Sequence, residues 1–407
     1  MPSDHPSSLF LNNSTNQLED RLQGLNLPSS ESNSSQSRHY EALNLMEDQP
    51  TSELPAPEVK DFKKNYKSRK CIFRCRGKVL GKGSYGRTRI VYKRQSDDKN
   101  PYVVKEFFKH AGISKKKRNE IIDKEYTLTR CARHPNVINV IDLCIRKDNL
   151  SYVMEYCNQG DLWDILEKRR YPVKDQLCLF KQLLRGVANL HSQGIAHLDI
   201  KPGNLLLGND SVLRLTDFGF SDIFRDPKTH QVLLCPPDNS GPGTAGYAPP
   251  EVFRHADYDP FKVDVWSCAM VALEITRRVP FPWEMPVETD QDYLAFVKGW
   301  REFMRANPNG VITEHCYPRC GPISDPRHYP NIQLMVLILK MLNPHPGHRI
   351  SIHKALRDPF VRNIECCSPA YIRNAPPLHP PTIKHDHRAC PALPAPPRSI
   401  MGRRGRT

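Results

Sequence analysis

The stretch that decides the fold reads His197-Leu-Asp-Ile-Lys-Pro-Gly-Asn204, and Asp217-Phe-Gly219 follows it after a short apolar run. The first stretch places a carboxylate (Asp199), an ammonium group (Lys201) and an amide (Asn204) within a few residues of one another. The amide of Asn204 and the carboxylate of Asp217 both offer oxygen atoms, which are the ligands that Mg²⁺ prefers. Each residue alone also has an ordinary structural explanation, so the interpretation depends on what precedes them.

A glycine-rich stretch lies upstream, Gly81-Lys-Gly-Ser-Tyr-Gly86, between two predicted strands. Glycines there would let backbone amides approach phosphate oxygens without a Cβ in the way. A dinucleotide-binding turn would lead into a helix, whereas here a strand follows, and a plain hairpin would explain the stretch if it stood alone. Lys105, on the strand-like YVVKEFF, and Glu125, on the next predicted helix, add a cation and a carboxylate that could fix it.

In this order, the motifs resemble those of the eukaryotic protein kinase family, in its serine/threonine branch. The resemblance covers residues 71–361 and includes VMEYC at 153–157, Gly243–Glu251 and Asn343–Arg349. It implies an α+β protein with the two-lobed protein kinase fold, made of a small β-rich N-lobe and a larger α-helical C-lobe. The residue pattern agrees, because strand-like pieces dominate up to residue 156 and apolar helices follow.

Three segments are expected along the chain. Residues 1–70 are predicted to be a disordered Ser/Asn-rich tail with a basic linker, because such a sequence cannot bury enough apolar surface to offset its ordering entropy. Residues 71–365 are predicted to be the kinase domain, with an N-lobe at 71–156 and a C-lobe at 157–365. Residues 366–407 are predicted to be a Pro-rich, basic and disordered tail.

The resemblance implies transfer of the ATP γ-phosphoryl group to Ser or Thr hydroxyls of protein substrates, in intracellular signalling. Asp199 would accept or orient the substrate hydroxyl, and Lys201 would stabilise the transferred group. The implied catalytic residues are Asp199, Lys201, Lys105 and Glu125. The implied ATP-binding residues are Gly81, Lys82, Gly83, Ser84, Gly86, Thr88, Val103, Lys105, Met154, Glu155, Cys157, Asp161, Asn204 and Asp217. The implied Mg²⁺ ligands are Asn204 and Asp217.

Several positions depart from the family pattern. Leu198 stands where an arginine usually clamps a phosphate on the activation segment. We therefore hypothesise that activation-segment phosphorylation is not needed, with substitution by another basic residue as the alternative. Gly203 stands where many kinases that prefer basic substrates carry glutamate, which weakens this preference, although Asp161 retains an acidic group. Val103 and Thr88 leave the shape of the adenine pocket open.

A second resemblance concerns the sub-family. The segment PFPWEMPVETDQDYLAFVKGW at residues 280–300 resembles fungal nutrient- and ion-regulating kinases of the halotolerance type. The Ser/Asn-rich N-terminus is compatible with such kinases. This second resemblance depends on one segment, whereas the first depends on the whole series of motifs.

The composition agrees with one large domain and its tails. The 407 residues carry a net charge of +15 and 37 prolines, and collagen-like, coiled-coil and disulfide-scaffold proteins are excluded. No apolar stretch approaches ~20 residues, so no membrane span is expected. The basic charge lacks an aromatic-interleaved array, so no specific nucleic acid is expected. The 13 scattered cysteines are expected as reduced thiols, in the cytoplasm or also the nucleus.

Two short motifs have alternative explanations. Cys316-x-x-x-Cys320, with His315 and His328 nearby, could be imagined as zinc ligands, but the spacing is off the common pattern and we favour an ordinary structural role. The tail sequence Arg388-x-x-Pro391-x-x-Pro394 matches one orientation of ligands for Src-homology-3 domains, although short Pro-rich motifs often arise by chance.

The competing hypothesis for function is a pseudokinase scaffold, whose fold would serve only for binding. The discriminating feature is the complete set Lys105, Glu125, Asp199, Asn204 and Asp217, which a scaffold has no need to keep. A nucleic-acid-binding protein is a third hypothesis, and steeply salt-dependent DNA binding would favour it.

Overall fold

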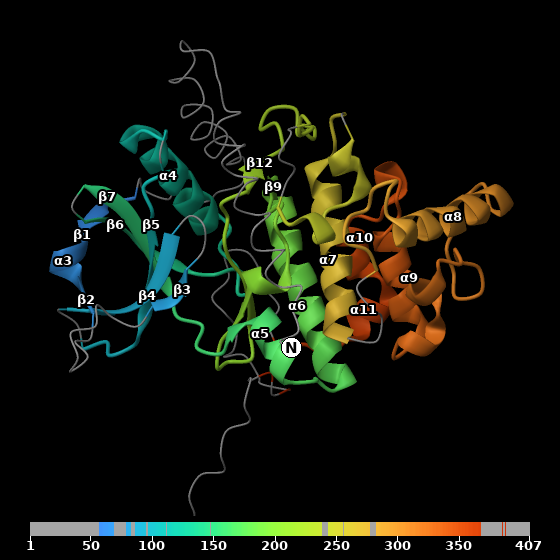
Figure 1. Cartoon of the computed structure of the whole chain (residues 1–407). Coiled ribbons are helices and arrows are strands. Elements are labelled where there is room, and N and C mark those ends of the chain that lie inside the picture. Colours follow the sequence, from blue (N-terminus) through green and yellow to red (C-terminus); the bar gives the residue numbers. More distant parts are fainter. Residues whose placement is uncertain are drawn as a thin grey trace, which may run out of the picture.

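The computed structural model describes residues 57–68, 79–82, 86–94, 97–110, 112–146, 148–237, 243–254, 256–276, 282–367, 385 and 387. These residues form two lobes, a curled β-sheet with one long helix and a larger, mostly helical part (Figure 1). The predicted α+β, two-lobed arrangement is confirmed.

The N-lobe is a seven-stranded sheet with the order β1-β6-β7-β5-β4-β2, in which β3 also pairs with β4. Its strands are β1 Val59–Asp61, β2 Tyr66–Lys67, β3 Val79–Lys82, β4 Gly86–Lys93, β5 Tyr102–Phe107, β6 Val140–Arg146 and β7 Asn149–Glu155. Helix α3 (Phe62–Asn65) joins β1 to β2, and α4 (Lys115–Cys131) packs against β6 and β7. The central strand β5 is therefore hydrogen-bonded on both sides, and it carries Lys105.

The first turn of helix α4 is capped by a side chain. Oγ of Ser114 accepts the backbone N–H of Lys117 at 3.1 Å, which caps the first turn. Its buried residues include Ile122 and Tyr126, which belong to the apolar cluster under the sheet. Glu125 lies on this buried face, so the helix delivers a carboxylate to the sheet.

The predicted domain start at Cys71 is too late. Strand β1 pairs in parallel with β6, with Val59 opposite Leu143, and β2 pairs with β4. Phe62 and Tyr66 are buried in the sheet's second apolar cluster. The sequence conceals these strands because only these two aromatic residues enter the core from a basic, polar stretch. The predicted disorder of residues 1–56 concerns residues outside those described.

The C-lobe is built mainly from helices. They are α5 Leu162–Lys168, α6 Val173–Ser192, α7 Pro260–Thr276, α8 Gln291–Ala306, α9 Ile332–Met341, α10 Ile352–Arg357 and α11 Pro359–Asn363, with short 3-10 helices η1 Pro202–Asn204, η2 Ala245–Tyr247, η3 Pro250–Phe253, η4 Gly321–Ser324, η5 Pro326–His328 and η6 Pro346–His348. Two small sheets face the N-lobe. They are β8 Gly160–Asp161 with β10 Leu205–Leu207 and β11 Leu213–Leu215, and β9 Ile195–Ala196 with β12 Asp222–Ile223.

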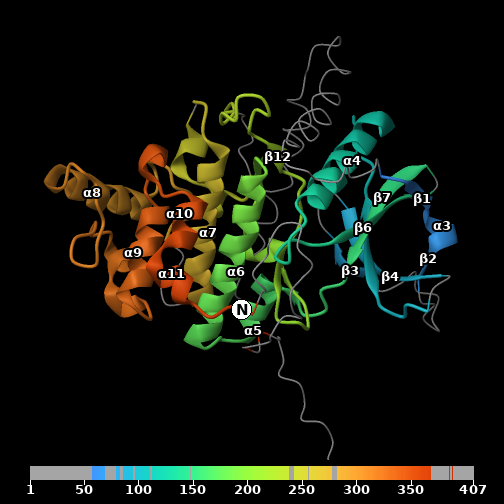
Figure 2. The same ribbon diagram turned by 180° about the vertical axis from the view of Figure 1, so that it is seen from behind.

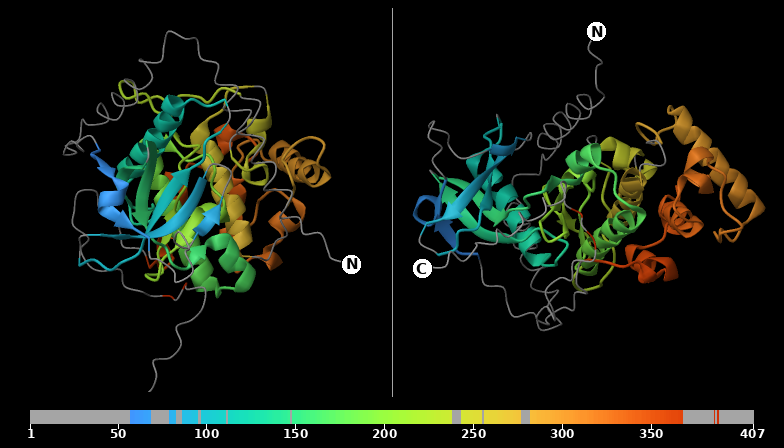
Figure 3. Two further views of the ribbon diagram at one scale, coloured as in Figure 1. Left: turned by 60° about the vertical axis from the view of Figure 1, so that its left-hand side comes forward. Right: turned by 90° about the horizontal axis from the view of Figure 1, so that it is seen from below.

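Helices α6 and α7 form the centre of this lobe and lie side by side (Figure 2). Trp266 on α7 is fully buried in the large apolar cluster, to which α6 contributes Leu179, Leu183 and Leu184. Helix α8 lies at the edge farthest from the sheet (Figure 3). Among the described residues, no helix combines the length and apolar character that crossing a membrane requires.

The C-terminal boundary also needs correction. We predicted that structure ends at Glu365, yet the side chain of Cys367 is 1% exposed, and His385 and His387 are 4% and 0% exposed. These residues pack against the C-lobe, because the backbone N–H of His387 donates to Oγ of Ser211 at 3.2 Å. The other residues of the predicted disordered tail beyond residue 367 lie outside those described.

Candidate active site

A lysine on β5 lies between two carboxylates that come from different elements. Nζ of Lys105 is 2.6 Å from Oε1 of Glu125 on α4 and 2.8 Å from Oδ1 of Asp217, which follows β11. The Lys105 and Glu125 side chains are buried, whereas that of Asp217 is 39% exposed. The structure therefore brings these three predicted site residues together, with one carboxylate open to solvent.

Burial and charge act in opposite directions on these groups. Burial alone would raise the pKa of Asp217, but the charge of Lys105 and its hydrogen bond lower that pKa to about 2. Burial raises the pKa of Glu125, and Lys105 only partly offsets this effect. Burial also disfavours charged Lys105, yet the two carboxylates hold its pKa well above the ordinary value. Lys105 and Asp217 are therefore both charged at neutral pH.

Tyr152 on β7 belongs to the same group, and the sequence interpretation missed it. Its hydroxyl donates to Oε1 of Glu125 at 2.8 Å, the oxygen that also binds Lys105. Its ring packs against those of Phe107 and Tyr126. Tyr152 lies opposite Lys105 in the β5–β7 register, so the signal that could have found it is the pairing of these strands.

The loop at residues 197–201 is held from below by one buried carboxylate. Asp264 on α7 accepts the backbone N–H groups of His197 and Leu198, each at 2.8 Å, and lies 2.9 Å from Nε2 of His191. Leu198 has a φ of 66°, which is uncommon for a residue with a side chain. Asp264 therefore braces the loop, because these bonds fix the strained backbone that positions Asp199.

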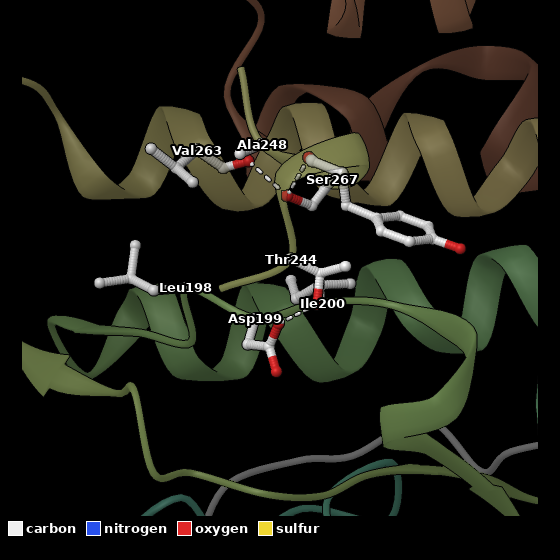
Figure 4. Close-up of a pocket in the computed structure, with 8 residues that line it drawn as sticks. Leu198, Asp199, Ile200, Thr244, Ala248, Val263 and Ser267 are labelled. Atoms are coloured by element: carbon white, nitrogen blue, oxygen red, sulfur yellow. Dashed lines mark hydrogen bonds between the residues drawn. The ribbon is translucent and has the colours of Figure 1, made fainter. Parts of the chain in front are cut away.

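Asp199 is the centre of a small polar network (Figure 4). Oδ1 accepts the hydroxyl of Thr244 at 2.9 Å, and Oδ2 lies 3.0 Å from Nζ of Lys201. Lys201 in turn donates to Oγ1 of Thr244 at 2.6 Å. Nδ2 of Asn204 donates to the backbone oxygen and to Oδ2 of Asp199, both at 2.8 Å. The predicted catalytic aspartate, lysine and amide thus converge with an activation-segment threonine.

A glycine makes this close approach of the activation segment feasible. Gly243 has a φ of 63°, and a Cβ there would lie 2.4 Å from the backbone oxygen of Leu198 and 2.8 Å from Oδ1 of Asp199. Any other residue would be strained and would push the segment away. Gly243 therefore brings Thr244 within hydrogen-bond distance of Asp199.

Leu198 has an apolar environment. Its side chain points away from the Asp199 carboxylate (Figure 4) and is 3% exposed. It packs in a cluster with Cys235, Val252 and Phe261, among others. The side chain that replaces the usual arginine thus joins the C-lobe and the activation segment through apolar contact.

The glycine-rich region is described in part. Gly81, Lys82, Gly86 and Thr88 lie on the paired strands β3 and β4, whereas Gly83 and Ser84 lie outside the described residues. At Gly86 a Cβ would lie 2.2 Å from the backbone oxygen of Glu106, so cross-strand packing alone requires glycine. At Gly81 a Cβ would lie 3.4 Å from Oγ1 of Thr88, which is an ordinary van der Waals contact. The predicted phosphate contacts of this region stay predictions.

The residues predicted to line the adenine pocket are close together at the lobe junction. Val103, Met154 and Cys157 belong to one buried apolar cluster. Burial raises the pKa of the Cys157 thiol to about 12, so it is not a reactive thiolate. Glu155 lies on the same strand, and its side chain is 3.0 Å from Nε of Arg214. Their contacts with adenine stay predictions.

Asp161 has a structural role that the sequence interpretation did not assign. Its Oδ1 accepts the backbone N–H of Asp164 at 2.9 Å and caps α5. Burial raises the pKa of this carboxyl, and the backbone hydrogen bond opposes that effect. The cap explains why an aspartate stands at this position even without a ligand. The predicted role of Asp161 in ATP binding therefore stays a prediction.

Comparison with family models gives one decisive match. Residues 75–361 match the protein kinase domain. The chain belongs to the protein kinase family. The two ends of the C-lobe motifs also meet, since Arg349 and Glu251 form a buried ion pair with contacts of 2.6 and 3.0 Å. This kinase domain therefore has both the sequence motifs and the internal contacts of its family.

Curated relatives include fungal serine/threonine-protein kinases. The chain is 32% identical over 340 residues to the kinase HAL4/SAT4 of Saccharomyces cerevisiae, a match that covers 78% of this chain and 52% of that protein. It is 33% identical to a probable serine/threonine-protein kinase of Schizosaccharomyces pombe, over 72% of this chain and 38% of that protein. The nitrogen permease reactivator protein of Saccharomyces cerevisiae is 31% identical, over 72% of this chain and 39% of that protein. The resemblance to halotolerance-type kinases is confirmed, although the chain spans about half or less of these proteins.

Proposed function

We propose that this chain is an active protein serine/threonine kinase. The observation that carries the proposal is the continuous charged group Glu125–Lys105–Asp217, together with Asp199 and Asn204 in hydrogen-bond contact. Family membership supports the reaction class, in which ATP is the substrate and a divalent metal assists. A scaffold has no need of this assembled set.

The donor set fits Mg²⁺. Asp217 carries an ionised carboxylate, since its pKa is about 2, and its side chain is partly open. Both hydrogens of the Asn204 amide point to Asp199, which leaves Oδ1 as a ligand atom. Hard oxygen ligands of this kind suit Mg²⁺. Bound there with ATP, the ion would neutralise negative charge on the phosphate oxygens.

The remaining residues would orient the reactants. Lys105, held by Glu125, would bind the α- and β-phosphates, and Asp199 would accept a hydrogen bond from the substrate hydroxyl. Lys201 would place a positive charge beside the transferred group. Thr244 now bridges Lys201 and Asp199, so its hydroxyl marks the position where an alcohol side chain can meet both groups.

The test is phosphate transfer from labelled Mg·ATP to a generic basic protein and to the chain itself. We expect transfer by the full chain and at least about 10³-fold less by Asp217→Ala, because positioning and charge stabilisation supply most of the catalysis. Asp325→Ala is the matched control. The pKa of Asp325 is also about 2, owing to its exposed ion pair with Arg327 and not to a site.

Two results would contradict an active kinase. If the full chain binds Mg·ATP but transfers no phosphate, also after removal of residues 1–56, the scaffold hypothesis is favoured. If Asp217→Ala retains more than about a tenth of the rate, the metal-binding assignment is wrong. Equal loss in the Asp325 control would point to general instability instead of catalysis.

We further propose a preference for substrates with basic residues. A cleft of about 940 Å³ beside Lys201 and Thr244 is lined by several acidic side chains, including Asp164, Glu284 and Asp292. Trp163 and Met285, both exposed by about two fifths, give the same cleft an apolar part. Charge complementarity would therefore favour a cationic peptide, even though Gly203 replaces the usual glutamate.

Peptide kinetics test this preference. We expect a peptide with arginines near the acceptor Ser to have a KM about tenfold below that of its glutamate counterpart. The double change Asp164→Asn with Asp292→Asn should raise the KM of the arginine peptide several-fold at constant kcat. An equal KM for both peptides would contradict the proposal, and Asp325→Asn is again the control.

Two further proposals have only sequence support. Arg388, Pro391 and Pro394 lie outside the described residues, and we propose them as a ligand for Src-homology-3 domains because of their spacing. Binding of a tail peptide to a panel of such domains, lost on Arg388→Ala, would test it. A location in the cytoplasm, and also the nucleus, is proposed from cysteine usage, and cell fractionation would test it.

A further inference from the structure

Four buried side chains from three distant parts of the chain converge beside α6. They are Cys178 on α6, Cys367 after α11, and His385 and His387. One ligand atom from each lies within 4.8 Å of all the others, and all four residues are buried. Tetrahedral zinc with sulfur and nitrogen ligands needs ligand atoms about 3.3–3.8 Å apart. The distance of 3.5 Å from Sγ of Cys367 to Nδ1 of His385 already meets this need.

Each sulfur atom accepts at least one backbone N–H hydrogen bond. Sγ of Cys178 accepts the backbone N–H of Cys367 at 3.2 Å and an amide N–H of Gln182 at 3.4 Å. Sγ of Cys367 accepts the backbone N–H of His385 at 3.3 Å. Donors that point at sulfur stabilise the thiolate form, which is the form that binds metal.

The histidine nitrogens are arranged as in ligands. Nδ1 of His387 lies 2.9 Å from the backbone oxygen of Ser211, which places its hydrogen there and leaves a lone pair on Nε2. That Nε2 is buried without a hydrogen-bond partner among the described residues. Oδ1 of Asp175 lies 4.0 Å from this Nε2, beyond hydrogen-bond distance, and adds negative charge beside the ligand atom. Burying an imidazole nitrogen without a partner is costly, and a bound cation would remove that cost.

We propose that Cys178, Cys367, His385 and His387 form a structural Zn²⁺ site. Four protein ligands close the coordination sphere, so the ion has no open position for a substrate and would stabilise the fold without taking part in phosphate transfer. Two thiolates and two neutral imidazoles balance the charge of the ion, which suits full burial. Borderline-soft sulfur and nitrogen ligands favour zinc over Mg²⁺ or Ca²⁺.

The site would fasten the C-terminal segment to the back of the kinase domain. Gln182 bonds the ligand Cys178 and also the backbone oxygen of Ser211, next to His387. The hydroxyl of Tyr171 donates to the backbone oxygen of His387. Without an ion, these few hydrogen bonds must hold two residues that follow Cys367 by about twenty positions. Metal binding adds far more free energy than such bonds.

Within the part of the chain that the structure describes, no other cysteines and histidines form a group of this kind. Cys320 is buried, and its Sγ contacts the backbone oxygen of Phe296, whereas Sγ of Cys316 donates to Oδ1 of Asn307. The two sulfur atoms of the Cys316-x-x-x-Cys320 motif thus contact different oxygen atoms and do not share a site. A disulfide between Cys178 and Cys367 is the alternative for the new site, but it would leave the buried Nε2 of His387 unexplained.

The experiment measures metal content in the full-length chain, purified under reducing conditions from zinc-supplemented medium. We expect about one zinc per chain by mass spectrometry of the elements, and below about one tenth in Cys367→Ser and in His387→Ala. Cys316→Ser is the matched control and should keep its zinc. The prediction does not depend on kinase activity, so it fails or succeeds separately from the proposed function.

Cobalt replaces zinc in a second measurement that needs no variant. The wild-type chain loaded with Co²⁺ should show intense tetrahedral visible bands and a thiolate charge-transfer band, which supports the proposal even where a variant fails to fold. Three results would overturn it: a folded wild-type chain that takes up neither ion, equal zinc in the site variants and the wild type, or a Cys178–Cys367 disulfide without bound metal.

Discussion

The two polar clusters of this protein lie near opposite ends of one helix, yet they are built in opposite ways. Cys178 and its partners lie beside the first half of α6, whereas His191 near its end contacts Asp264 under the catalytic loop. The catalytic cluster has separate positive and negative charges, and Asp217 is partly exposed. The Cys/His cluster is closed, with its side chains almost completely buried.

This difference agrees with the roles proposed for the two clusters. A site that binds and releases a nucleotide needs charged groups held by protein and open to solvent, as Lys105 is held by Glu125. A site that only fastens a segment needs saturated ligands and no access. Changes in the first should therefore alter rate, and changes in the second should alter metal content and the attachment of the tail.

Beyond Asp217→Ala, the largest effect on rate is expected for Lys105→Met. It removes the cation between Glu125 and Asp217, so we expect phosphate transfer to fall by at least about 10²-fold while zinc content is unchanged. Steady-state rates and elemental analysis measure both. Lys93→Met is the control, since Lys93 lies 3.8 Å from Asp98 at the surface. Loss of zinc in Lys105→Met would break the separation of the two clusters.

The same variant has a predicted pH dependence. Burial already raises the pKa of Glu125, and without Lys105 it should rise further. The folded state then binds more protons than the unfolded state, so the free energy of unfolding falls as pH rises. We expect the variant to have a lower free energy of unfolding than the wild type. The deficit should be larger at pH 8 than at pH 5, and the difference between the two deficits should be about 1–3 kcal/mol. Denaturant titrations measure this, and an opposite slope would contradict the assignment.

A smaller effect on rate but a clear effect on stability is expected for Asp264→Asn. The amide can replace only part of the acceptor capacity that serves His191, His197 and Leu198. We expect a loss of about 2–4 kcal/mol in unfolding free energy and a slower enzyme, because the strained backbone at Leu198 loses its brace. Asp259→Asn, where Asn can still cap α7, is the control. Unchanged stability of Asp264→Asn would show that the loop is held in another way.

The sequence predicts the catalytic cluster well because its residues stand in short motifs whose spacing reflects local geometry. Lys105 contacts Asp217, and Asn204 contacts Asp199. Tyr152 was missed, because its role depends on strand register and not on a motif. The Cys/His cluster was missed for a stronger reason, since the 189 positions between Cys178 and Cys367 leave no metal-binding spacing to read.

The predicted boundaries failed at both ends for related reasons. Composition predicted tails before Cys71 and after Glu365, and polar composition indeed argues against a core. Single side chains nevertheless carry the attachment, Phe62 and Tyr66 at one end and His385 and His387 at the other. Average composition over tens of residues cannot register two buried rings.

A modest effect is expected for Tyr171→Phe. It removes the hydroxyl that donates to the backbone oxygen of His387 but keeps the ring that packs against the imidazole. We expect a loss of about 1 kcal/mol and faster protease cleavage after Cys367, with zinc content and rate unchanged. Limited proteolysis with and without a zinc chelator measures it. If the chelator does not accelerate cleavage in either the variant or the wild type, the tail is not attached through zinc.

The smallest effect is expected from removing phosphate from the activation segment. Leu198 is buried among Cys235, Val252 and Phe261, so apolar packing, together with Asp264, holds the catalytic loop where other kinases use an arginine and a phosphate. Phosphatase treatment, checked by mass spectrometry, should change the rate by less than about twofold. A large loss of rate would contradict the hypothesis that activation-segment phosphorylation is not needed. Arg225, whose guanidinium lies 5.4 Å from the Phe261 ring, would then be the candidate phosphate ligand, and Arg225→Gln should reproduce the loss.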